Sequence, residues 1–382
     1  LGDGSEYRDF IGIIDLFEEY SLGVLSKNDD VTIDFDRSVL SRRITQFRTK
    51  TESQLRSQFD LKEDSRDWVL KNAIADLNDN FRERNFRNIV YRPFDDRWTY
   101  FTGRTRGFFA YSQTRIMRNF ANKDNYALII GRTGDAVGSM QWNLVFITVG
   151  ISDQNIFYRG GGSVLPLYLY PDTETQQTIG GRNQRFPNLD QVIVENIAKK
   201  IGETFSEEKV DVPATFAPID ILDYVYAVLH SQIYREKYKE FLKIDFPRVP
   251  YPESSSAFRL LFQLGSELRK VHLLKTIDLP PRWDLKRDGS TLFQIAEVAA
   301  GFPKYEDGKV FINNTAWFDG VAEEVWNFHI GGYQVCHKWL KDRKGRTLSP
   351  EDIAHYGKIT VALRETIRLM AEIDEVIDAH GG

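Results

Sequence analysis

Residues 216–252 read Phe-Ala-Pro-Ile-Asp-Ile-Leu-Asp-Tyr-Val-Tyr-Ala-Val-Leu-His-Ser-Gln-Ile-Tyr-Arg-Glu-Lys-Tyr-Lys-Glu-Phe-Leu-Lys-Ile-Asp-Phe-Pro-Arg-Val-Pro-Tyr-Pro, and the rest of the chain divides around them. Apolar residues recur at three- and four-residue spacing, first over 221–229 and again over 234–242. This periodicity predicts two short helices in series. Asp220 can cap the first helix and Ser231 the second, while the three prolines near the end of the stretch forbid further helix.

The segments before this stretch change in character near Ile89. Residues 1–90 have helical spacing, with one apolar stripe over 10–17, a second over 66–86 and a polar stretch between them. After Ile89, β-branched and aromatic runs separated by glycine-containing turns predict strands. These runs are 98–102, 126–130, 142–149 and 164–170, and a helix is expected near 188–201.

The segments after Pro252 again mix helices and strands. Ser254 to Ser256 can cap a helix, and strands are expected at 310–312 and 325–330. A turn at Gly331-Gly332 and a basic helix and loop over 334–346 follow. Ser349-Pro-Glu-Asp then opens a long final helix with a cap, a proline in its first turn and two acids.

The charge of the chain is unevenly distributed. The 382 residues carry a net charge of −5, yet nine arginines and three acids lie within 82–118, and five basic residues and one acid within 335–346. Two basic runs in an acidic chain favour a directed anion-binding surface. The single cysteine, Cys336, excludes an intrachain disulfide. The sequence has no apolar run long enough for a membrane helix and no N-terminal signal segment, so we expect a cytoplasmic protein.

Catalytic motifs are missing from the sequence. The one Pro-Pro pair, in Leu279-Pro-Pro-Arg-Trp283, lacks the leading Asp or Asn and the aromatic residue of an amino-methyltransferase loop, so it is interpreted as a helix stop. The glycines at 131, 134 and 138 lack the spacing of a dinucleotide or phosphate-binding loop and fit a simple turn. The six histidines show no metal-ligand spacing, and His230 and His272 are expected to be structural.

Three blocks of the sequence resemble one family in that family's order. The first is Tyr91-Arg-Pro-Phe-Asp-Asp-Arg-Trp98, and the second comprises 224–231, 234–238 and Phe246-Pro-Arg-Val-Pro-Tyr-Pro252. The third contains Val325-Trp326, Gly331-Gly-Tyr-Gln-Val335 and Lys338-Trp-Leu340. Together they are similar to the target-recognition region of single-polypeptide restriction-modification enzymes, the Type ISP group with related fused Type II and phage-defence DNA adenine methyltransferases. The resemblance covers about residues 88–378.

The resemblance implies an α/β (α+β) fold, a mixed β-sheet recognition domain flanked by helices, with a helical N-terminal connector and a long C-terminal helix. It also implies four contiguous ranges. They are a connector from an upstream methyltransferase (1–88), a β-rich first half of the recognition domain (89–215), central helices (216–275) and a second half with the terminal helix (276–382). The chain starts at Leu1 without an initiator Met, so we expect a piece of a longer polypeptide.

By the same resemblance, the chain would recognise a specific sequence in double-stranded DNA. It would direct an adenine-N6 methyltransferase and an endonuclease located elsewhere in the polypeptide. S-adenosylmethionine and Mg²⁺ would serve those parts, no cofactor is expected within these residues, and no catalysis by them alone. In the Type ISP members an ATP-driven motor is also present.

The candidate DNA contacts are basic, polar or aromatic residues of loops, strand ends and the two basic runs. Guanidinium groups suit phosphate and guanine edges, and amides suit adenine, whereas the lysines are expected to touch phosphate. They are Arg104, Arg106, Arg115, Arg118, Arg132, Thr133, Gln141, Arg159, Tyr333, Gln334, Lys338, Lys341, Arg343 and Lys344. Arg92 and Arg97 are interpreted instead as structural partners of Asp95 and Asp96. The aromatic residues between the arginines have the alternative of forming core.

Two other functions stay open. One is a nucleotide- or S-adenosylmethionine-binding enzyme domain built on the Gly131–Gly138 turn, which nucleotide-induced thermal stabilisation would reveal. The other is a protein-interaction scaffold using the terminal helix, which would oligomerise and show no affinity for DNA.

Overall fold

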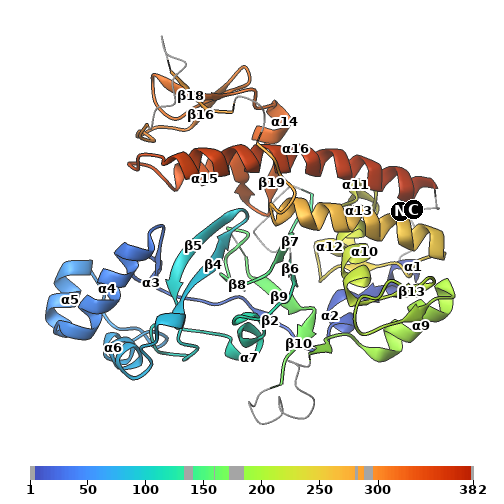
Figure 1. Ribbon diagram of the computed structural model, residues 1–382, viewed down its shortest axis with the longest axis horizontal. Helices are drawn as coiled ribbons and strands as arrows, with labels where there is room; N and C mark the ends of the chain where they lie inside the picture. The colour runs from blue at the N-terminus through green and yellow to red at the C-terminus, as the bar shows by residue number, and fades with distance from the viewer. Residues whose placement is uncertain are drawn as a thin grey trace. The chain divides into compact units, whose positions relative to one another are not determined.

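The computed structural model describes residues 5–132, 141–158, 160–171, 185–279, 283–287 and 296–379. The chain forms two compact units that alternate along the sequence, with the elements labelled in Figure 1. Unit 1 consists of Leu1–Ile13, Thr133–Ile147 and Val192–Gly382, and unit 2 of Ile14–Arg132 and Thr148–Gln191. Both units combine helices with small sheets, which confirms the α+β fold class. The four contiguous ranges given above stay a prediction.

Unit 1 is mainly helical. Its helices are α1 (Ser5–Arg8), α9 (Gln191–Ile201), α10 (Pro218–His230), α11 (Gln232–Lys237), α12 (Lys239–Leu242), α13 (Ser255–His272), α14 (Glu323–Trp326), α15 (Val335–Lys341) and α16 (Pro350–Ala379). Its strands are β1 (Ile11–Gly12), β12 (Thr204–Phe205), β13 (Thr215–Phe216), β14 (Arg248–Val249), β15 (Leu285–Arg287), β16 (Lys304–Glu306), β17 (Lys309–Phe311), β18 (Ala316–Asp319), β19 (His329–Ile330) and β20 (Tyr333–Gln334). Strand β7 (Val145–Thr148) lies where the chain passes into unit 2.

Helices α10 and α13 form the core of unit 1. Every residue of α10 from Ile221 to His230 is buried, as expected for a predominantly apolar helix in an interior. The two helices meet at Gly265, where a Cβ atom would lie 1.9 Å from the carbonyl oxygen of Asp223. Only glycine permits this approach, so any larger residue would force the helices apart.

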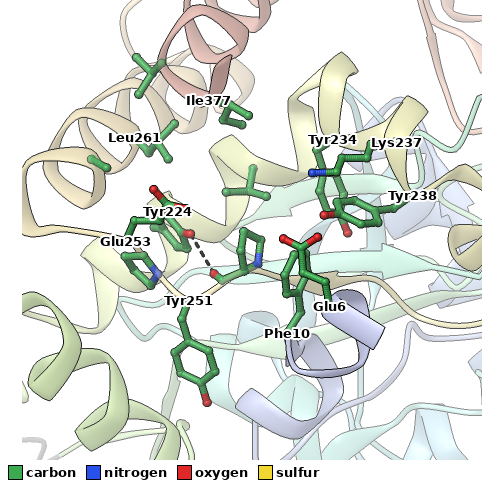
Figure 2. A pocket seen from close by; sticks show the side chains of 15 residues that line it. Glu6, Phe10, Tyr224, Tyr234, Lys237, Tyr238, Tyr251, Glu253, Leu261 and Ile377 are labelled. Carbon is green, nitrogen blue, oxygen red and sulfur yellow. Dashed lines mark hydrogen bonds between the residues drawn. The ribbon is translucent and has the colours of Figure 1, made fainter. Parts of the chain in front are cut away.

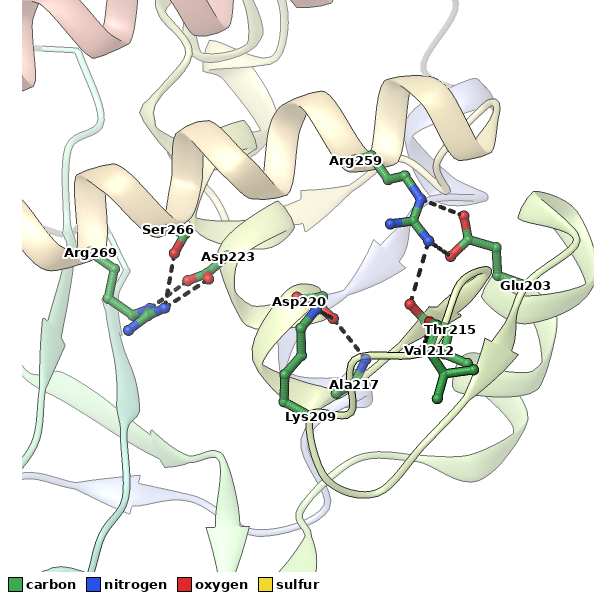
Figure 3. Close-up of polar contacts among 10 residues, drawn as sticks. All are labelled: Glu203, Lys209, Val212, Thr215, Ala217, Asp220, Asp223, Arg259, Ser266 and Arg269. Carbon is green, nitrogen blue, oxygen red and sulfur yellow. Dashed lines mark hydrogen bonds and ion pairs between the residues drawn. The ribbon is translucent and has the colours of Figure 1, made fainter.

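Ion pairs connect the polar positions of this core (Figure 3). The guanidinium of Arg269 on α13 lies 2.6 Å from Asp223 on α10, with both side chains buried. Burial raises the pKa of Asp223 to about 6, and Arg269 opposes that shift. A buried charge left without its partner is strongly destabilising, so this pair fixes the register of the two helices.

The histidines of the core are structural, as predicted. Tyr226 and His272 share a 2.5 Å hydrogen bond, and the other ring nitrogen of His272 lies 2.8 Å from the hydroxyl of Thr366 on α16. The ring of His230 hydrogen-bonds to the carbonyl of Tyr226. Burial lowers the pKa of His272 to about 3, so its imidazole is neutral at physiological pH.

The C-terminal part of unit 1 joins a small sheet to the terminal helix. The strand order is β15-β18-β17-β16, with every neighbouring pair antiparallel. Phe318 of β18 lies between Trp283 and Tyr356 of α16, at ring-centroid distances of 5.4 and 4.6 Å. Ser349 and Asp352 exchange side-chain to backbone hydrogen bonds at the start of α16, which confirms the predicted cap.

Unit 2 contains two larger sheets and one two-stranded sheet, with helices beside them. Its helices are α2 (Ile13–Leu16), α3 (Asp29–Thr32), α4 (Arg37–Thr49), α5 (Glu52–Phe59), α6 (Leu70–Asp79) and α7 (Thr114–Met117), with 3-10 turns η1 (Glu83–Asn85) and η2 (Arg118–Phe120). Its strands are β2 (Ser21–Leu22), β3 (Ile33–Asp34), β4 (Phe86–Arg92), β5 (Asp95–Tyr100), β6 (Ala127–Gly131), β8 (Ile151–Ser152), β9 (Gly162–Pro166), β10 (Tyr168–Leu169) and β11 (Phe186–Pro187). One sheet has the order β3-β5-β4-β8, and in the other β9 pairs antiparallel with both β2 and β6.

Helix caps at the central stretch follow the prediction in part. Ser231 accepts a hydrogen bond from the amide of Tyr234 and caps α11, as expected. Helix α10 instead starts at Pro218 after Ala217. Asp220 lies inside its first turn and accepts a hydrogen bond from the Ala217 amide at 2.9 Å. Proline in the first turn already supplies helical φ, so the helix begins earlier than the carboxylate suggested.

Two predictions of secondary structure are wrong. Val325 and Trp326 belong to helix α14, whereas a strand was expected over 325–330, of which only His329–Ile330 is extended. The acids at 323 and 324 favour a helix start there. The stripe over 10–17 is interrupted by β1, which pairs with β14 through Ile11 and Val249. Pro280 and Pro281, interpreted as a helix stop, lie outside the described residues.

Candidate nucleic-acid interface

The loop after β5 is held in place by buried aromatic residues of unit 2. Phe108 and Phe109 are buried, and the carboxylate of Asp76 on α6 accepts hydrogen bonds from the Phe108 amide and the Thr102 hydroxyl, each at 2.8 Å. A Cβ atom at Gly107 would lie 2.3 Å from that carboxylate, so the loop needs glycine there. The loop is thus a rigid support from which neighbouring side chains project.

Three predicted arginines on this loop and the following helix α7 are exposed. Arg104 has 45% of its side chain exposed and makes a contact of 3.5 Å with Asp79. Arg106 is exposed and forms no ion pair with any described residue. Arg115 is 71% exposed, although Glu19 lies 3.1 Å away. Exposed pairs of this kind contribute little and are readily exchanged for phosphate.

The fourth arginine, Arg118, is half-buried. Its Nε donates to the carbonyl of Arg115 at 3.1 Å, and its charge lowers the pKa of Lys123, after the larger effect of burial. Arg118 therefore contributes positive potential to the surface around Lys123.

Two arginines of the first basic run are structural, as interpreted, but one has a different partner. Arg97 binds Asp95 at 2.7 Å, as expected. Arg92 instead binds Asp153 at 2.9 Å, because the parallel pairing of β4 with β8 brings the following Asp153 beside it. Both guanidinium groups lie over the ring of Tyr91, at 3.9 and 4.1 Å from its centroid. These cations are neutralised and half-buried or buried.

Most of the aromatic residues between the arginines form core. Tyr100, Phe101, Phe108 and Phe109 are buried. Tyr91, Trp98 and Tyr111 are partly exposed. The hydroxyls of Tyr91 and Tyr111 donate to Asp29 and Asp67, so both tyrosines are held by their own acids.

The candidates near the 131–138 turn are only partly described. Arg132 and Gln141 are exposed. Thr133 and Arg159, together with Gly134 and Gly138, lie outside the described residues. Their assignment as contacts, and the nucleotide-binding alternative at this turn, stay predictions.

The second basic run, in unit 1, separates by residue type. Lys341 and Lys344 are exposed, and Lys338 is half-buried. Arg343 is buried, with its guanidinium carbon 3.4 Å from the centre of the Trp339 ring and its Nη1 donating to the Trp339 carbonyl. Burial, and then Lys341 and Lys338, lower the pKa of His337.

The two polar candidates beside α15 face inward. Tyr333 is buried, and Gln334 is half-buried, with its amide donating to the Trp326 carbonyl at 2.9 Å. In this arrangement neither Tyr333 nor Arg343 presents its side chain to an outside ligand. The exposed basic residues of this run are therefore Lys341, Lys344 and Arg346.

Comparison with known families decides what kind of domain carries these surfaces. A family model described as the Type ISP C-terminal specificity domain matches residues 15–372. The chain belongs to this family. The blocks that suggested it, at 91–98, 224–252 and 325–340, all lie within the matched range.

Solved structures show the same fold as this specificity domain. They include the ATP-dependent Type ISP restriction-modification enzyme LlaBIII bound to DNA, with 15% identity, a TM-score of 0.68, and coverage of 97% of this chain and 24% of that chain. The DrdV–DNA complex has 20% identity, a TM-score of 0.69, and coverage of 97% and 39%. A nuclease-deletion mutant of the Type ISP enzyme LlaGI in complex with a DNA substrate mimic has 16% identity, a TM-score of 0.61, and coverage of 96% and 29%.

The specificity domain corresponds to a minor part of those enzymes. This chain spans from 24% to 39% of their length. No curated protein matches the chain. Within the described ranges, none of the helices has the length and apolar character needed to cross a membrane. The same ranges contain no group of three His, Cys, Asp or Glu side chains placed to hold a metal ion.

A basic pocket in unit 2 was missed as a site in the sequence. It has a volume of about 570 Å³ and is lined by Arg84, Arg87, Asn88, Trp98 and Lys123, among others. The run of nine arginines includes Arg84 and Arg87, but spacing alone did not separate them from their neighbours. No local pattern distinguishes this site, because its lining residues come from β4, β5 and the segments 120–124 and 150–151, which strand pairing brings together.

A second pocket, in unit 1, is lined by tyrosines (Figure 2). Tyr224, Tyr234 and Tyr238 surround it, and the Tyr224 hydroxyl donates to the carbonyl of Pro250 at 2.9 Å. Its volume of about 90 Å³ is below the roughly 300 Å³ at which small-molecule sites begin. Burial raises the pKa of Tyr224 and of Tyr234, so these phenols are neutral packing groups.

Proposed function

We propose that this specificity domain recognises a specific sequence in double-stranded DNA. It would direct an adenine-N6 methyltransferase and an endonuclease carried elsewhere in a longer polypeptide, where S-adenosylmethionine and Mg²⁺ would be bound. The observation that carries the proposal is the arginine surface of a family-member fold, in which Arg104, Arg106 and Arg115 project from an aromatic-anchored support. A cytoplasmic location is part of the same proposal.

The division of work between the exposed groups follows from their chemistry. Arginines can contact both phosphates and the O6 and N7 atoms of guanine, and they project here from a rigid loop. Lysines are compact point charges that suit phosphate, which fixes the position of the duplex without reading it. We therefore assign Lys338, Lys341 and Lys344 to phosphate, and Arg104, Arg106, Arg115, Arg132 and Gln141 to the surface on which bases are read.

The fold of the family supports DNA recognition by this domain. The DNA complexes of LlaBIII and DrdV contain a region of the same fold. Nothing in the chain supplies a methyltransferase loop, since the Pro-Pro pair at 280–281 is followed by arginine. The domain would thus hold the duplex while a methyltransferase cleft elsewhere receives the flipped adenine.

Binding selection from a randomised duplex pool tests the proposal. The chain should enrich one asymmetric sequence, and affinity for it should fall steeply between 50 and 200 mM salt, roughly a thousandfold or more if six or more phosphates are contacted. The double variant Arg104→Ala/Arg115→Ala should bind the selected duplex at least about tenfold more weakly. Each lost charge-assisted contact is worth on the order of 1 kcal/mol or more.

A charge-matched control makes this result specific. Lys239→Ala/Lys243→Ala also removes two positive charges, but from exposed lysines on or beside α12 that pair with Glu236 and Glu240. Its duplex affinity should equal that of the parent. Equal affinity of the arginine double variant and the parent, or the absence of any enriched sequence, would contradict the proposed function.

A further inference from the structure

The basic pocket of unit 2 contains more positive charge than the protein itself neutralises. Neither Arg84 nor Arg87 forms an ion pair with a described residue, and the Nε of Arg87 is enclosed without a hydrogen-bond partner. Burial lowers the pKa of Arg87, and the nearby charge of Arg84 lowers it further. Lys123 is subject to the same two influences, from burial and from Arg118.

The acid in this pocket does not balance these cations. Asp124 has 87% of its side chain exposed, and its closest ion pair is with Arg185, at 3.7 Å. The exposed guanidinium of Arg84 and the half-buried side chains of Arg87 and Lys123 carry charges of the same sign, which repel one another. A bound anion would relieve that repulsion and give the Arg87 Nε an acceptor.

The pocket also presents an aromatic ring and two amides beside the charges. Asn88 of β4 and Trp98 of β5 face each other directly across the antiparallel pair, so their side chains lie on the same face of the sheet. The guanidinium of Arg37 on α4 lies 5.7 Å from the centre of the Trp98 ring and supports it. Asn122, which is exposed, adds a second amide to the lining.

This combination matches one unit of a nucleic acid whose base is not stacked. Phosphate suits the three cations, an unstacked base can lie on the indole, and amides can meet base edges. In a duplex the faces of each base are covered by its neighbours, so the indole of Trp98 would have no base face to contact. The pocket therefore fits an unpaired nucleotide better than it fits a duplex backbone.

We propose that the pocket of Arg84, Arg87, Asn88, Trp98 and Lys123 binds a nucleoside monophosphate unit from an unpaired DNA segment. Arg84, Arg87 and Lys123 hold the phosphate, Trp98 stacks on the base, and Asn88 reads its edge. The inference rests on the proposed function, because it assumes that DNA reaches unit 2. It adds a strand-separated segment to the duplex that the exposed arginines would hold.

The test compares a labelled ten-nucleotide single strand with the selected blunt duplex by fluorescence polarisation, using the whole 382-residue chain. Trp98→Ala should weaken single-strand binding roughly ten- to a hundredfold, since one base stacked on an aromatic ring is worth on the order of 1–3 kcal/mol. Its duplex affinity should stay within twofold of the parent. Trp317→Ala, which removes a partly exposed tryptophan of β18, is the matched control and should change neither.

A second variant tests the pocket without removing a packed ring. Gly150 lines the pocket, and a Cβ atom added there meets nothing within 4 Å. Gly150→Leu should therefore keep the melting temperature of the parent while occupying the space of the ligand. Loss of single-strand binding in both variants supports the proposal, and unchanged binding in Gly150→Leu overturns it.

Other results have defined meanings. Equal losses for single strand and duplex would show that the pocket holds a duplex backbone, which contradicts the unpaired ligand. Binding of free deoxyadenosine monophosphate as tight as that of the ten-nucleotide strand would assign the pocket to free nucleotides and overturn the DNA source. If Arg104→Ala/Arg115→Ala leaves duplex binding intact while Trp98→Ala abolishes single-strand binding, the proposed function fails and the pocket assignment stands.

Discussion

The two basic runs of the chain, 82–118 in unit 2 and 335–346 in unit 1, both carry a net positive charge but divide their charges differently. In unit 2, Arg92 and Arg97 are paired with acids, whereas Arg104, Arg106 and Arg115 remain accessible. In unit 1 the arginine at 343 is buried against Trp339, whereas Lys341, Lys344 and Arg346 are exposed. Position relative to the core therefore decides which charge is available to a ligand, and local charge density does not.

The comparison implies that removing a buried arginine costs stability, whereas removing an exposed one costs only DNA affinity. Arg92→Ala leaves Asp153 buried without its partner, so we expect a loss of about 3–5 kcal/mol in the free energy of unfolding. Denaturant titration measures it. Arg106→Ala is the matched control and should stay within about 0.5 kcal/mol of the parent. Similar stability of the two variants would remove the distinction between the two classes of arginine.

The pH dependence of stability tests the burial of Asp153, the partner of Arg92. Burial raises the pKa of this carboxyl to about 6, and Arg92 opposes that shift. The folded pKa lies above the unfolded value, so the contribution of this group is fully present below about pH 4 and is lost as the pH rises through 6. The stability of the parent relative to Asp153→Asn should fall by on the order of 2–3 kcal/mol over that window. A flat or rising difference between pH 4 and 7 would contradict the assignment.

The buried arginine of unit 1 allows a smaller test of the comparison. Arg343→Ala removes a cation on the Trp339 ring and a hydrogen bond to its carbonyl, so a loss of about 1–3 kcal/mol is expected. Lys344→Ala, at the next position and exposed, should leave the thermal midpoint unchanged. A DNA-binding defect in Arg343→Ala without a stability defect would instead return Arg343 to the contact surface.

The exposed lysines should show the smallest effect. Lys341→Ala should weaken binding to selected and unrelated duplexes about equally and reduce the slope of log affinity against log salt by about 1. Polarisation titrations at four salt concentrations measure this. A change in which sequence is preferred would contradict the assignment of Lys341 to phosphate.

Much of the local structure could be predicted from patterns that depend on neighbouring residues. The periodicity over 221–229 predicted α10, Ser231 and Ser349 were recognised as caps, and two histidines without ligand spacing proved structural. The failures arose where distant residues decide. The strand at Ile11 forms because β14 lies beside it. Arg92 pairs with Asp153, 61 positions away, and not with the nearby acids.

The sequence by itself determined the family, the α+β class and the presence of two basic runs, because motif order, hydrophobic period and charge are properties of neighbouring residues. Only the tertiary structure decided which cations are neutralised and which are offered to a ligand. The pairing of β4 with β5 and β8 gathers Asn88 and Trp98 on one face while it brings Asp153 to Arg92. Such juxtapositions depend on the register of strands from distant segments, which the spacing of residues along the chain does not predict.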